Sequence, residues 1–346
     1  MRAVRLHGSR DMRLGQVADP TPGPGDALIR VRAVGVCGSN VHFYLDGRIG
    51  DAVAPIPFTL GHEFSGEIVE LGRGADGPPV GTRVAVDPAI PCGSCGACRE
   101  GNPNCCPDVR FAATPPVEGA LSELYVHPAH LCVPLPEGMT HAEGALLEPL
   151  GVAIHATALA KVAPGGSVAV LGAGPIGLLV EQLALRSAGA VYVCDPIPER
   201  RAFAGRLGAS AVCDPGAEDP TEWLLDRTDG LGVDVVVEAA WGAEAVDVAM
   251  RMARPAGRVV LVGIPREDVC SFTAGEARRK GLTIRMSRRM KAVYPQAIAL
   301  IERGSVDLRS LITHRFVLEE AGTAFDLVAS LGDGVCKAMI EIDLPV

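Results

Sequence analysis

Four cysteines stand within one short, glycine-rich stretch of the chain, PCGSCGACREGNPNCC, with the spacing C-x2-C-x2-C-x7-C. Thiolates are soft ligands, and four of them at tetrahedral reach hold Zn²⁺ in a closed site. Because two-residue gaps let neighbouring sulfurs face one ion, the spacing favours a structural zinc lobe at about residues 90–110 over a disulfide cluster. The predicted ligands are Cys92, Cys95, Cys98 and Cys106, and Cys105 is a neighbouring thiol outside the set. Such a site orders its lobe without revealing what the chain does.

A second group of metal-binding residue types is spread over two glycine-flanked turns. Cys37 stands in GVCGSNVH, and His62 and Glu63 stand in LGHEFSG. Thiolate, imidazole and carboxylate together form a donor set typical of a zinc ion that keeps one coordination position open. Each residue alone is better explained as a buried cysteine, a core histidine or a surface acid. Their combination favours a catalytic metal centre.

The segment SVAVLGAGPIGLLVEQLALRSAGAVYVCD has the pattern of a strand, a glycine turn, a helix and a second strand. Its loop fits G-x-G-x-x-G, in which the glycines permit the turn, the approach of a pyrophosphate and close helix packing. The free N–H groups at the start of the helix favour an anion there. Asp195 ends the next strand at the spacing expected for a ribose-binding acid. We therefore predict a dinucleotide site whose loop residues are Gly172, Gly174, Pro175, Ile176 and Gly177.

The pattern of predicted strands and helices changes near residue 149, and a length of 346 residues suits two domains. Residues 1–148 alternate short β-type runs with Gly/Pro turns, which indicates an antiparallel, partly barrel-like β domain. From 149 onward, continuous apolar strands alternate with helical segments. This pattern predicts an α/β domain with a doubly wound parallel sheet.

Charge and hydropathy exclude some partners. The net charge of −9 argues against nucleic acid, and no uninterrupted apolar run has the length of a membrane span. The start of the chain, MRAVRLHGSRDM, has no apolar run of the secretory type. Eleven cysteines without an export signal indicate a reducing compartment, so we expect a cytoplasmic protein. With nucleic acid and membrane disfavoured, the expected partner is a small molecule.

Several segments together resemble one known family, the zinc-dependent medium-chain dehydrogenases, and most closely their sorbitol (polyol) dehydrogenase branch. The similarity covers nearly the whole chain. GHE and GAGPIG are widespread in that superfamily, whereas GRIG, ATPP and the EPL-type segment are more characteristic of the polyol branch. The segments are GVCGSNVH at 35–42, GRIG at 47–50, GHEFSGEIVELG at 61–72, the four-cysteine lobe, FAATPPVEGAL at 111–121, ALLEPLGVAIHA at 145–156, GAGPIG at 172–177 and THRF at 313–316.

The resemblance implies a specific architecture. A GroES-like, β-barrel-type catalytic domain is expected from residues 1–148 and 288–346, with a Rossmann NAD-binding domain inserted at 149–287. The expected cofactors are NAD and two Zn²⁺ per subunit. Family members with an intact four-cysteine lobe also suggest a homo-oligomer, most often a tetramer.

The resemblance assigns the catalytic zinc to Cys37, His62 and Glu63, with Glu148 as a second carboxylate near the metal. Which of the two glutamates ligates zinc at rest stays open. A metal ion in this set acts as a Lewis acid that lowers the pKa of an alcohol, whose carbon then gives hydride to the nicotinamide.

Two residues match the proton-relay positions of related enzymes, and one neighbour departs from the family. Ser39 and His42 are expected to pass the released proton to solvent, although His42 alone is also compatible with a surface histidine. Asn40 replaces an aspartate that usually accepts a bond from the zinc-bound histidine. Because an amide carries no charge, the metal should be more electrophilic.

The remaining expected contacts concern the cofactor and the substrate. Besides Asp195, the resemblance places Arg200 at the adenine face and a Val262, Gly263, Ile264 segment against the cofactor. The expected substrate residues are Phe43, Phe111 and Arg289. Around Arg289 the segment RRMKAVYP lacks polar side chains common in polyol enzymes, so the pocket should be less polar than that of a dedicated sorbitol enzyme.

The sequence thus predicts a zinc enzyme that oxidises a polyol or secondary alcohol to a ketone with NAD⁺. A threonine or aminocyclitol (amino-alcohol) dehydrogenase is the alternative within the class. A non-enzymatic nucleotide-binding protein on the same scaffold is disfavoured, because all four candidate catalytic ligands, Glu148 included, are retained.

Overall fold

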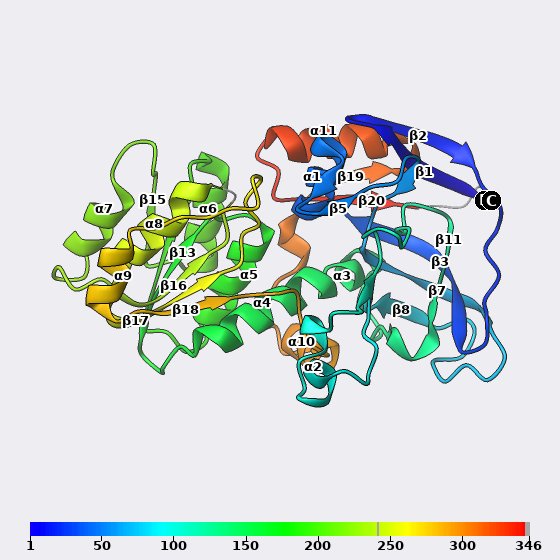
Figure 1. The fold of residues 1–346 in the computed structure, drawn as a ribbon, viewed down its shortest axis with the longest axis horizontal. Coiled ribbons are helices and arrows are strands. Elements are labelled where there is room, and N and C mark those ends of the chain that lie inside the picture. Colours follow the sequence, from blue (N-terminus) through cyan, green and yellow to red (C-terminus); the bar gives the residue numbers. More distant parts are fainter. Residues whose placement is uncertain (241, 343–346) are drawn as a thin grey trace. The chain divides into compact units, whose positions relative to one another are not determined.

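The computed structural model describes residues 1–240 and 242–342 of the chain. Its contacts divide the chain into two compact units (Figure 1). Unit 1 comprises residues 1–148, 294–298 and 308–346, and unit 2 comprises residues 149–293 and 299–307. From the sequence, we expected the chain to re-enter the first domain at residue 288. In the structure it re-enters unit 1 at Tyr294, and residues 299–307 belong to unit 2.

Unit 1 is built on a mainly antiparallel sheet with the order β12-β8-β7-β3-β20-β19, in which β11 also pairs with β3. Only β19 and β20 run parallel to each other. The expected antiparallel β architecture of the first domain is therefore confirmed. The strands are β3 (Asp26–Gly35), β7 (Glu63–Leu71), β8 (Arg83–Val86), β11 (Leu124–Pro128), β12 (Cys132–Pro134), β19 (Ile312–Val317) and β20 (Lys337–Glu341).

Smaller sheets and short helices complete this unit. A three-stranded sheet has the order β2-β1-β6, and β9 with β10 and β4 with β5 form two-stranded pairs. These strands are β1 (Arg2–Gly8), β2 (Asp11–Gln16), β4 (Arg48–Ile49), β5 (Ala52–Val53), β6 (Phe58–Thr59), β9 (Ala89–Ile90) and β10 (Arg110–Phe111). The α-helices are α1 (Gly38–Asp46), α2 (Gly96–Arg99), α3 (His141–Ala145) and α11 (Ala321–Ser330). The 3₁₀ turns are η1 (Pro103–Cys105), η2 (Ala129–Leu131), η3 (Arg309–Leu311) and η4 (Leu318–Glu320).

Apolar side chains of β1, β3, β6 and β7 pack into one core in unit 1. Fully buried members include Leu6, Ile29, Phe58, Phe64 and Ile68.

Unit 2 contains a six-stranded, wholly parallel sheet with the order β15-β14-β13-β16-β17-β18. The chain starts in the middle of the sheet and winds outward in both directions, which confirms the doubly wound Rossmann arrangement. The strands are β13 (Ser167–Leu171), β14 (Ala190–Cys194), β15 (Ala211–Cys213), β16 (Val233–Glu238), β17 (Ala253–Leu261) and β18 (Thr283–Met286). The helices are α5 (Pro175–Ala184), α6 (Pro198–Leu207), α7 (Pro220–Asp226), α8 (Ala243–Met252) and α9 (Ala274–Lys280).

Two helices cross the division between the units: α4 (Leu147–Ala160) and α10 (Tyr294–Glu302). Within unit 2, Val168, Ala169 and Val170 of β13 are all fully buried, because helices cover a parallel sheet. None of the helices in the described part of the chain combines the length and apolar character needed to cross a bilayer.

Candidate active site and metal centres

The predicted catalytic donors lie together where strand β3 of unit 1 ends and the neighbouring strand β7 begins. Cys37 follows β3 and caps the start of α1, and His62 and Glu63 lie at the start of β7. Gly35 of β3 is the cross-strand partner of Glu63, which brings the three donors together. Their ligand atoms all lie within 4.8 Å of one another, with His62 4% and Glu63 1% exposed. A partly buried thiol with a buried imidazole and a buried carboxylate at this separation fits a zinc ion.

The electrostatics of the group also fit a cation. Burial raises the pKa of Cys37 to about 11, and the negative charge of Glu63 raises it further, while Lys337 and a hydrogen bond from Ser39 act in the opposite sense. Ser39 Oγ lies 3.2 Å from Cys37 Sγ. A thiol that binds metal must release its proton, so a bound divalent cation would favour the thiolate that this site otherwise disfavours.

Glu148 lies beside this group but outside it. It is 4% exposed, in the first turn of α4. Burial raises its pKa to about 8; His62 and Lys337 oppose the shift, while Glu63 and Cys37 add to it. The donors that satisfy the 4.8 Å limit include Glu63 and not Glu148. The geometry therefore favours Glu63 as the carboxylate donor and leaves Glu148 as a neighbouring acid.

One residue of this region was missed by sequence reasoning. Lys337 of β20 is 3% exposed, and its Nζ donates to both carboxylate oxygens of Glu63, at 2.9 and 2.7 Å. The available signal was a lysine next to the apolar run AMI, because a lysine in a buried strand is almost never unpaired.

The predicted relay residues lie on α1, next to Cys37. His42 is buried rather than on the surface. Asn40 is also buried, and its Oδ1 accepts the N–H of Gly61 at 3.1 Å. Asn40 therefore anchors the Leu60–Gly61 peptide, one residue before His62.

The two predicted aromatic substrate residues have different surroundings. The Phe111 ring centroid lies 5.1 Å from that of His62, so Phe111 packs directly on a predicted metal ligand. Phe43 is fully buried with its ring centroid 6.4 Å from that of Phe58, within the core of unit 1. Arg289 belongs to unit 2, where its backbone adopts φ +52°.

The four cysteines of the lobe form the second donor group, with all sulfurs within 4.8 Å of one another. Backbone N–H groups point at these sulfurs: Cys95 N lies 3.3 Å from Cys92 Sγ, and Cys92 N lies 3.4 Å from Cys106 Sγ. Backbone hydrogen bonds lower the pKa of Cys92 to about 6, which favours the thiolate that a metal binds. Cys105 is exposed and outside the group.

The glycine loop of unit 2 joins β13 to α5 as predicted. Gly172 has φ +92°, and a Cβ on Gly177 would lie 1.8 Å from the carbonyl oxygen of Gly172, so no side chain fits there. Gly174 is the N-cap of α5, and Pro175 begins the helix. The first N–H groups of α5 therefore lie next to a tight loop that carries no side chains at its glycines. Such free N–H groups suit a pyrophosphate.

Asp195 is buried and tied to this loop. One carboxylate oxygen accepts the N–H of Ala173 at 2.7 Å, and the other accepts the N–H of Ile197 at 2.8 Å. Arg200 Nη1 lies 3.7 Å from where a Cβ of Gly174 would be. Asp195 and Arg200 thus both border the glycine loop.

The predicted Val262–Gly263–Ile264 segment follows β17. Its Gly263 N–H lies 3.2 Å from Oε2 of Glu238, a buried acid at the end of β16 that sequence reasoning missed. Burial raises the pKa of Glu238 to about 7, against the hydrogen bonds from Ala240 and Gly263. Glu238 and Gly263 line a cavity of 110 Å³ at this edge of the sheet, together with Met286.

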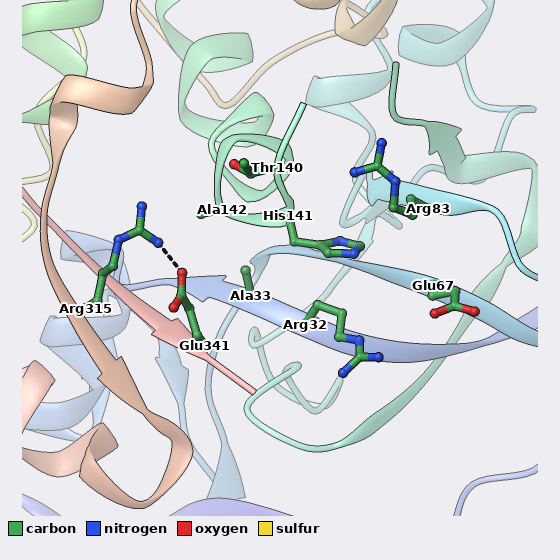
Figure 2. Close-up of a pocket in the computed structure, with 9 residues that line it drawn as sticks. All are labelled: Arg32, Ala33, Glu67, Arg83, Thr140, His141, Ala142, Arg315 and Glu341. Atoms are coloured by element: carbon green, nitrogen blue, oxygen red, sulfur yellow. Dashed lines mark hydrogen bonds and ion pairs between the residues drawn. The ribbon is translucent and has the colours of Figure 1, made fainter. Parts of the chain in front are cut away.

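A larger cavity of 410 Å³ lies elsewhere in unit 1 (Figure 2). It is lined mainly by charged side chains, and Figure 2 shows the Arg315–Glu341 ion pair at one end and Arg83 with Glu67 at the other. Its lining includes none of the predicted metal donors. It is therefore separate from the predicted site of the reaction.

Comparisons with known proteins agree with this arrangement. Residues 23–137 match the alcohol dehydrogenase GroES-like domain, and residues 175–303 match the zinc-binding dehydrogenase domain. The chain is 35% identical to a sorbitol dehydrogenase of Bacillus subtilis over 98% of this chain and 97% of that protein. It is 38% identical to a sorbitol dehydrogenase of Gallus gallus over 99% and 96%. A 2R,3R-butanediol dehydrogenase from Bacillus subtilis has the same fold, with a TM-score of 0.88, 30% identity and 99% coverage of both chains.

The two domain matches show that the chain belongs to the zinc-dependent medium-chain dehydrogenases. It is an NAD-dependent zinc enzyme that oxidises alcohols or polyols. Within the family it falls in the sorbitol dehydrogenase-like branch, because the similarity to sorbitol dehydrogenases extends over nearly the full chain.

Proposed function

We propose that this enzyme oxidises a secondary alcohol carbon in small vicinal or cyclic polyols, with broader tolerance than a dedicated sorbitol dehydrogenase. The observation that carries this is the group of Cys37, His62 and Glu63 with the buried acid Glu148 beside it. When bound there, zinc supplies a Lewis acid that lowers the pKa of the substrate hydroxyl. The sorbitol and 2R,3R-butanediol dehydrogenases named above act on molecules with adjacent hydroxyls, which supports the same preference here.

The chain's own residues would hold the substrate and remove its proton. In this proposal Ser39 Oγ, beside Cys37 Sγ, accepts the hydroxyl proton, and His42 carries it on toward solvent. Glu148, buried and outside the donor group, would hydrogen-bond a polyol hydroxyl through its carboxyl group. Phe111 packs against His62 and limits water around it.

We also propose a strong preference for NAD over NADP. Asp195 would accept hydrogen bonds from the adenosine ribose hydroxyls with the lone pairs left beside its two backbone bonds. A 2′-phosphate would bring like charges together. Arg200 would contact the adenine.

The substrate proposal is tested with a panel of vicinal polyols, simple secondary alcohols, L-threonine and aminocyclitols in the presence of NAD⁺, followed by the absorbance of the reduced cofactor. Vicinal polyols should give the highest kcat/KM. A site built to bond a hydroxyl can reject an analogue lacking it by about 10⁴-fold. Higher kcat/KM for amino alcohols would assign the alternative, and higher kcat/KM for simple alcohols would refute the polyol preference.

We further propose a homotetramer. In support, β18 is an edge strand of the unit 2 sheet, and its Met286 is 67% exposed. Nearby in sequence, Val269 and Phe272 are also exposed apolar side chains. An apolar edge strand is a ready surface for a second copy, and closed symmetry is the usual outcome. Light scattering should give four times the chain mass of 36.0 kDa, and a mass of one chain would refute this proposal.

We propose a cytoplasmic location for the enzyme. All eleven cysteines are free thiols, and two groups of thiols have the geometry of metal sites, which a reducing compartment preserves. Fractionation of the native host, with immunodetection of the chain, should recover it with cytoplasmic markers. Recovery from an extracellular or periplasmic fraction would contradict this.

A further inference from the structure

The Glu63 carboxylate is held by a buried ammonium group on a strand far away in the sequence. Lys337 Nζ donates to Glu63 Oε1 at 2.9 Å, to Glu63 Oε2 at 2.7 Å and to the carbonyl oxygen of Val36 at 3.0 Å. An ammonium has three N–H donors, so all three are used. The two side chains are 3% and 2% exposed. The contact is therefore fully desolvated, and its donor geometry is complete.

The carboxylate also lies against a glycine. Gly35 is the cross-strand partner of Glu63, and a Cβ added to Gly35 would lie 2.1 Å from Glu63 Oε2. Any side chain at Gly35 would therefore displace the carboxylate. β20, which carries Lys337, pairs with β3 through Met339 opposite Gly35. Three adjacent strands thus supply the carboxylate, the space that it occupies and the cation that holds it.

A buried ion pair is poor evidence for a purely stabilising role. The cost of removing two charges from water commonly equals or exceeds their attraction, and an apolar pair of similar size often serves as well. Here the anion belongs to the group of donors with Cys37 and His62. Each carboxylate oxygen has two lone pairs, so the bonds to Lys337 leave one on each oxygen for a metal ion. The geometry therefore points to orientation of a ligand.

We propose that Lys337 is a positioning residue that holds Glu63 as the carboxylate donor of the catalytic zinc, in the space that Gly35 provides. This inference rests on the proposed function and deepens it, because it assigns different tasks to the two acids. Glu63 is held by Lys337 and donates to the metal. Glu148, outside the donor group, stays available to bond the substrate.

The first test is zinc retention in Lys337→Met. Partners that orient a metal ligand typically contribute 10- to 100-fold in metal affinity. We expect the zinc dissociation constant of the catalytic site, measured by competition with a chromogenic chelator, to rise about 10- to 100-fold. Zinc in the four-cysteine lobe should stay bound and serves as an internal control. Lys337→Arg should retain more affinity than Lys337→Met. A catalytic-site affinity equal to or above that of the wild type would overturn the inference.

A matched control removes a lysine from another ion pair. Lys280 pairs with Glu276 at 2.9 Å in unit 2 and also donates to backbone carbonyls. Lys280→Met should leave both zinc sites at wild-type affinity. An equal loss of catalytic zinc in this control would show that deletion of any partly buried lysine loosens the protein, and the assignment to Lys337 would fail.

A double-mutant cycle separates positioning from folding. Lys337→Met leaves Glu63 buried without its cation, which can unfold the protein, whereas Glu63→Gln with Lys337→Met leaves no buried charge in the pair. If Lys337 acts through Glu63, it should change zinc affinity little in the Glu63→Gln background. An undiminished effect in that background would refute the inference. Gly35→Ala, which keeps the lysine, should also weaken the catalytic zinc.

Wild-type measurements separate failure of this inference from failure of the proposed function. Suppose that the wild type binds two zinc ions per chain and oxidises polyols, but Lys337→Met keeps its affinity for catalytic zinc. This result would refute only the positioning role of Lys337. One zinc ion per wild-type chain, held by the four-cysteine lobe, would remove the catalytic metal centre itself. Circular dichroism of each variant shows that the comparison is made between folded proteins.

Discussion

Glu181, a buried acid in α5, should make the enzyme less stable as the pH rises. Its side chain is fully buried, and burial raises its pKa from 4.5 to about 8, although the Ala209 N–H opposes the shift. Between these values the unfolded chain releases the proton and the folded chain keeps it. The folded state therefore binds more protons, so the free energy of unfolding falls as the pH increases. The effect begins above pH 4.5 and is complete above pH 8.

The magnitude follows from the shift. Each pKa unit corresponds to about 1.4 kcal/mol, so between pH 5 and pH 8 the group should remove roughly 3 kcal/mol of stability. Glu181→Gln has nearly the same shape and no titration in this range. The variant should match the wild type near pH 5 and exceed it by roughly 3 kcal/mol at pH 8.

The assay is urea unfolding of metal-loaded protein at half-unit intervals from pH 5 to pH 8.5. Glu267→Gln, at an exposed position in unit 2, is the control and should follow the wild-type profile. The quantity of interest is the difference between the profiles of Glu181→Gln and the wild type. Parallel profiles for these two proteins would show that Glu181 is ionised in the folded state, and the reasoning from burial would be refuted.

Four further predictions concern the metals, cofactor and substrate. Cys92→Ser should lower the zinc content from two ions per chain to one by mass spectrometry; unchanged content would show that the lobe binds no zinc. Gly177→Ala should abolish NADH binding in a fluorescence titration, because its Cβ would lie 1.8 Å from a carbonyl oxygen; retained binding would contradict this. Asp195→Ala should reduce the ratio of kcat/KM for NAD over NADP at least about tenfold; an unchanged ratio would exclude its role. Arg289→Ala should lower kcat/KM for a polyol far more than for a simple secondary alcohol; equal losses would indicate a cofactor or structural role.

The parts of the structure that sequence predicts well are those whose residues lie close together in the chain. The four lobe cysteines span Cys92 to Cys106, and the glycine loop spans Gly172 to Gly177, so local spacing alone determines which groups can meet. The strand–loop–helix context is also local, and it was confirmed where β13 leads into α5. Local geometry was sufficient for both motifs.

Contacts that depend on strand order were not accessible in the same way. Lys337 lies 274 positions from Glu63, and only the placement of β20 beside β3 joins them. Glu238 meets Gly263 through the pairing of β16 with β17. A single sequence gives strands and their character, but the order of distant strands depends on the whole packing. The burial of His42 likewise depends on what packs against α1, which its local pattern does not specify.

The position of β20 has a consequence for synthesis on the ribosome. The sheet of unit 1 has β20 between β3 and β19, although β3 is made near the beginning of the chain and β20 near its end. In a nascent chain that has emerged only as far as unit 2, the Ala33 to Gly35 end of β3 can pair with β7 but still lacks β20, and Glu63 lacks its cation. The pairing of Glu63 with its cation is therefore completed only after β20 has emerged. Unit 2 can form its sheet earlier, so the nucleotide-binding half of the enzyme should mature before the half that carries the catalytic metal.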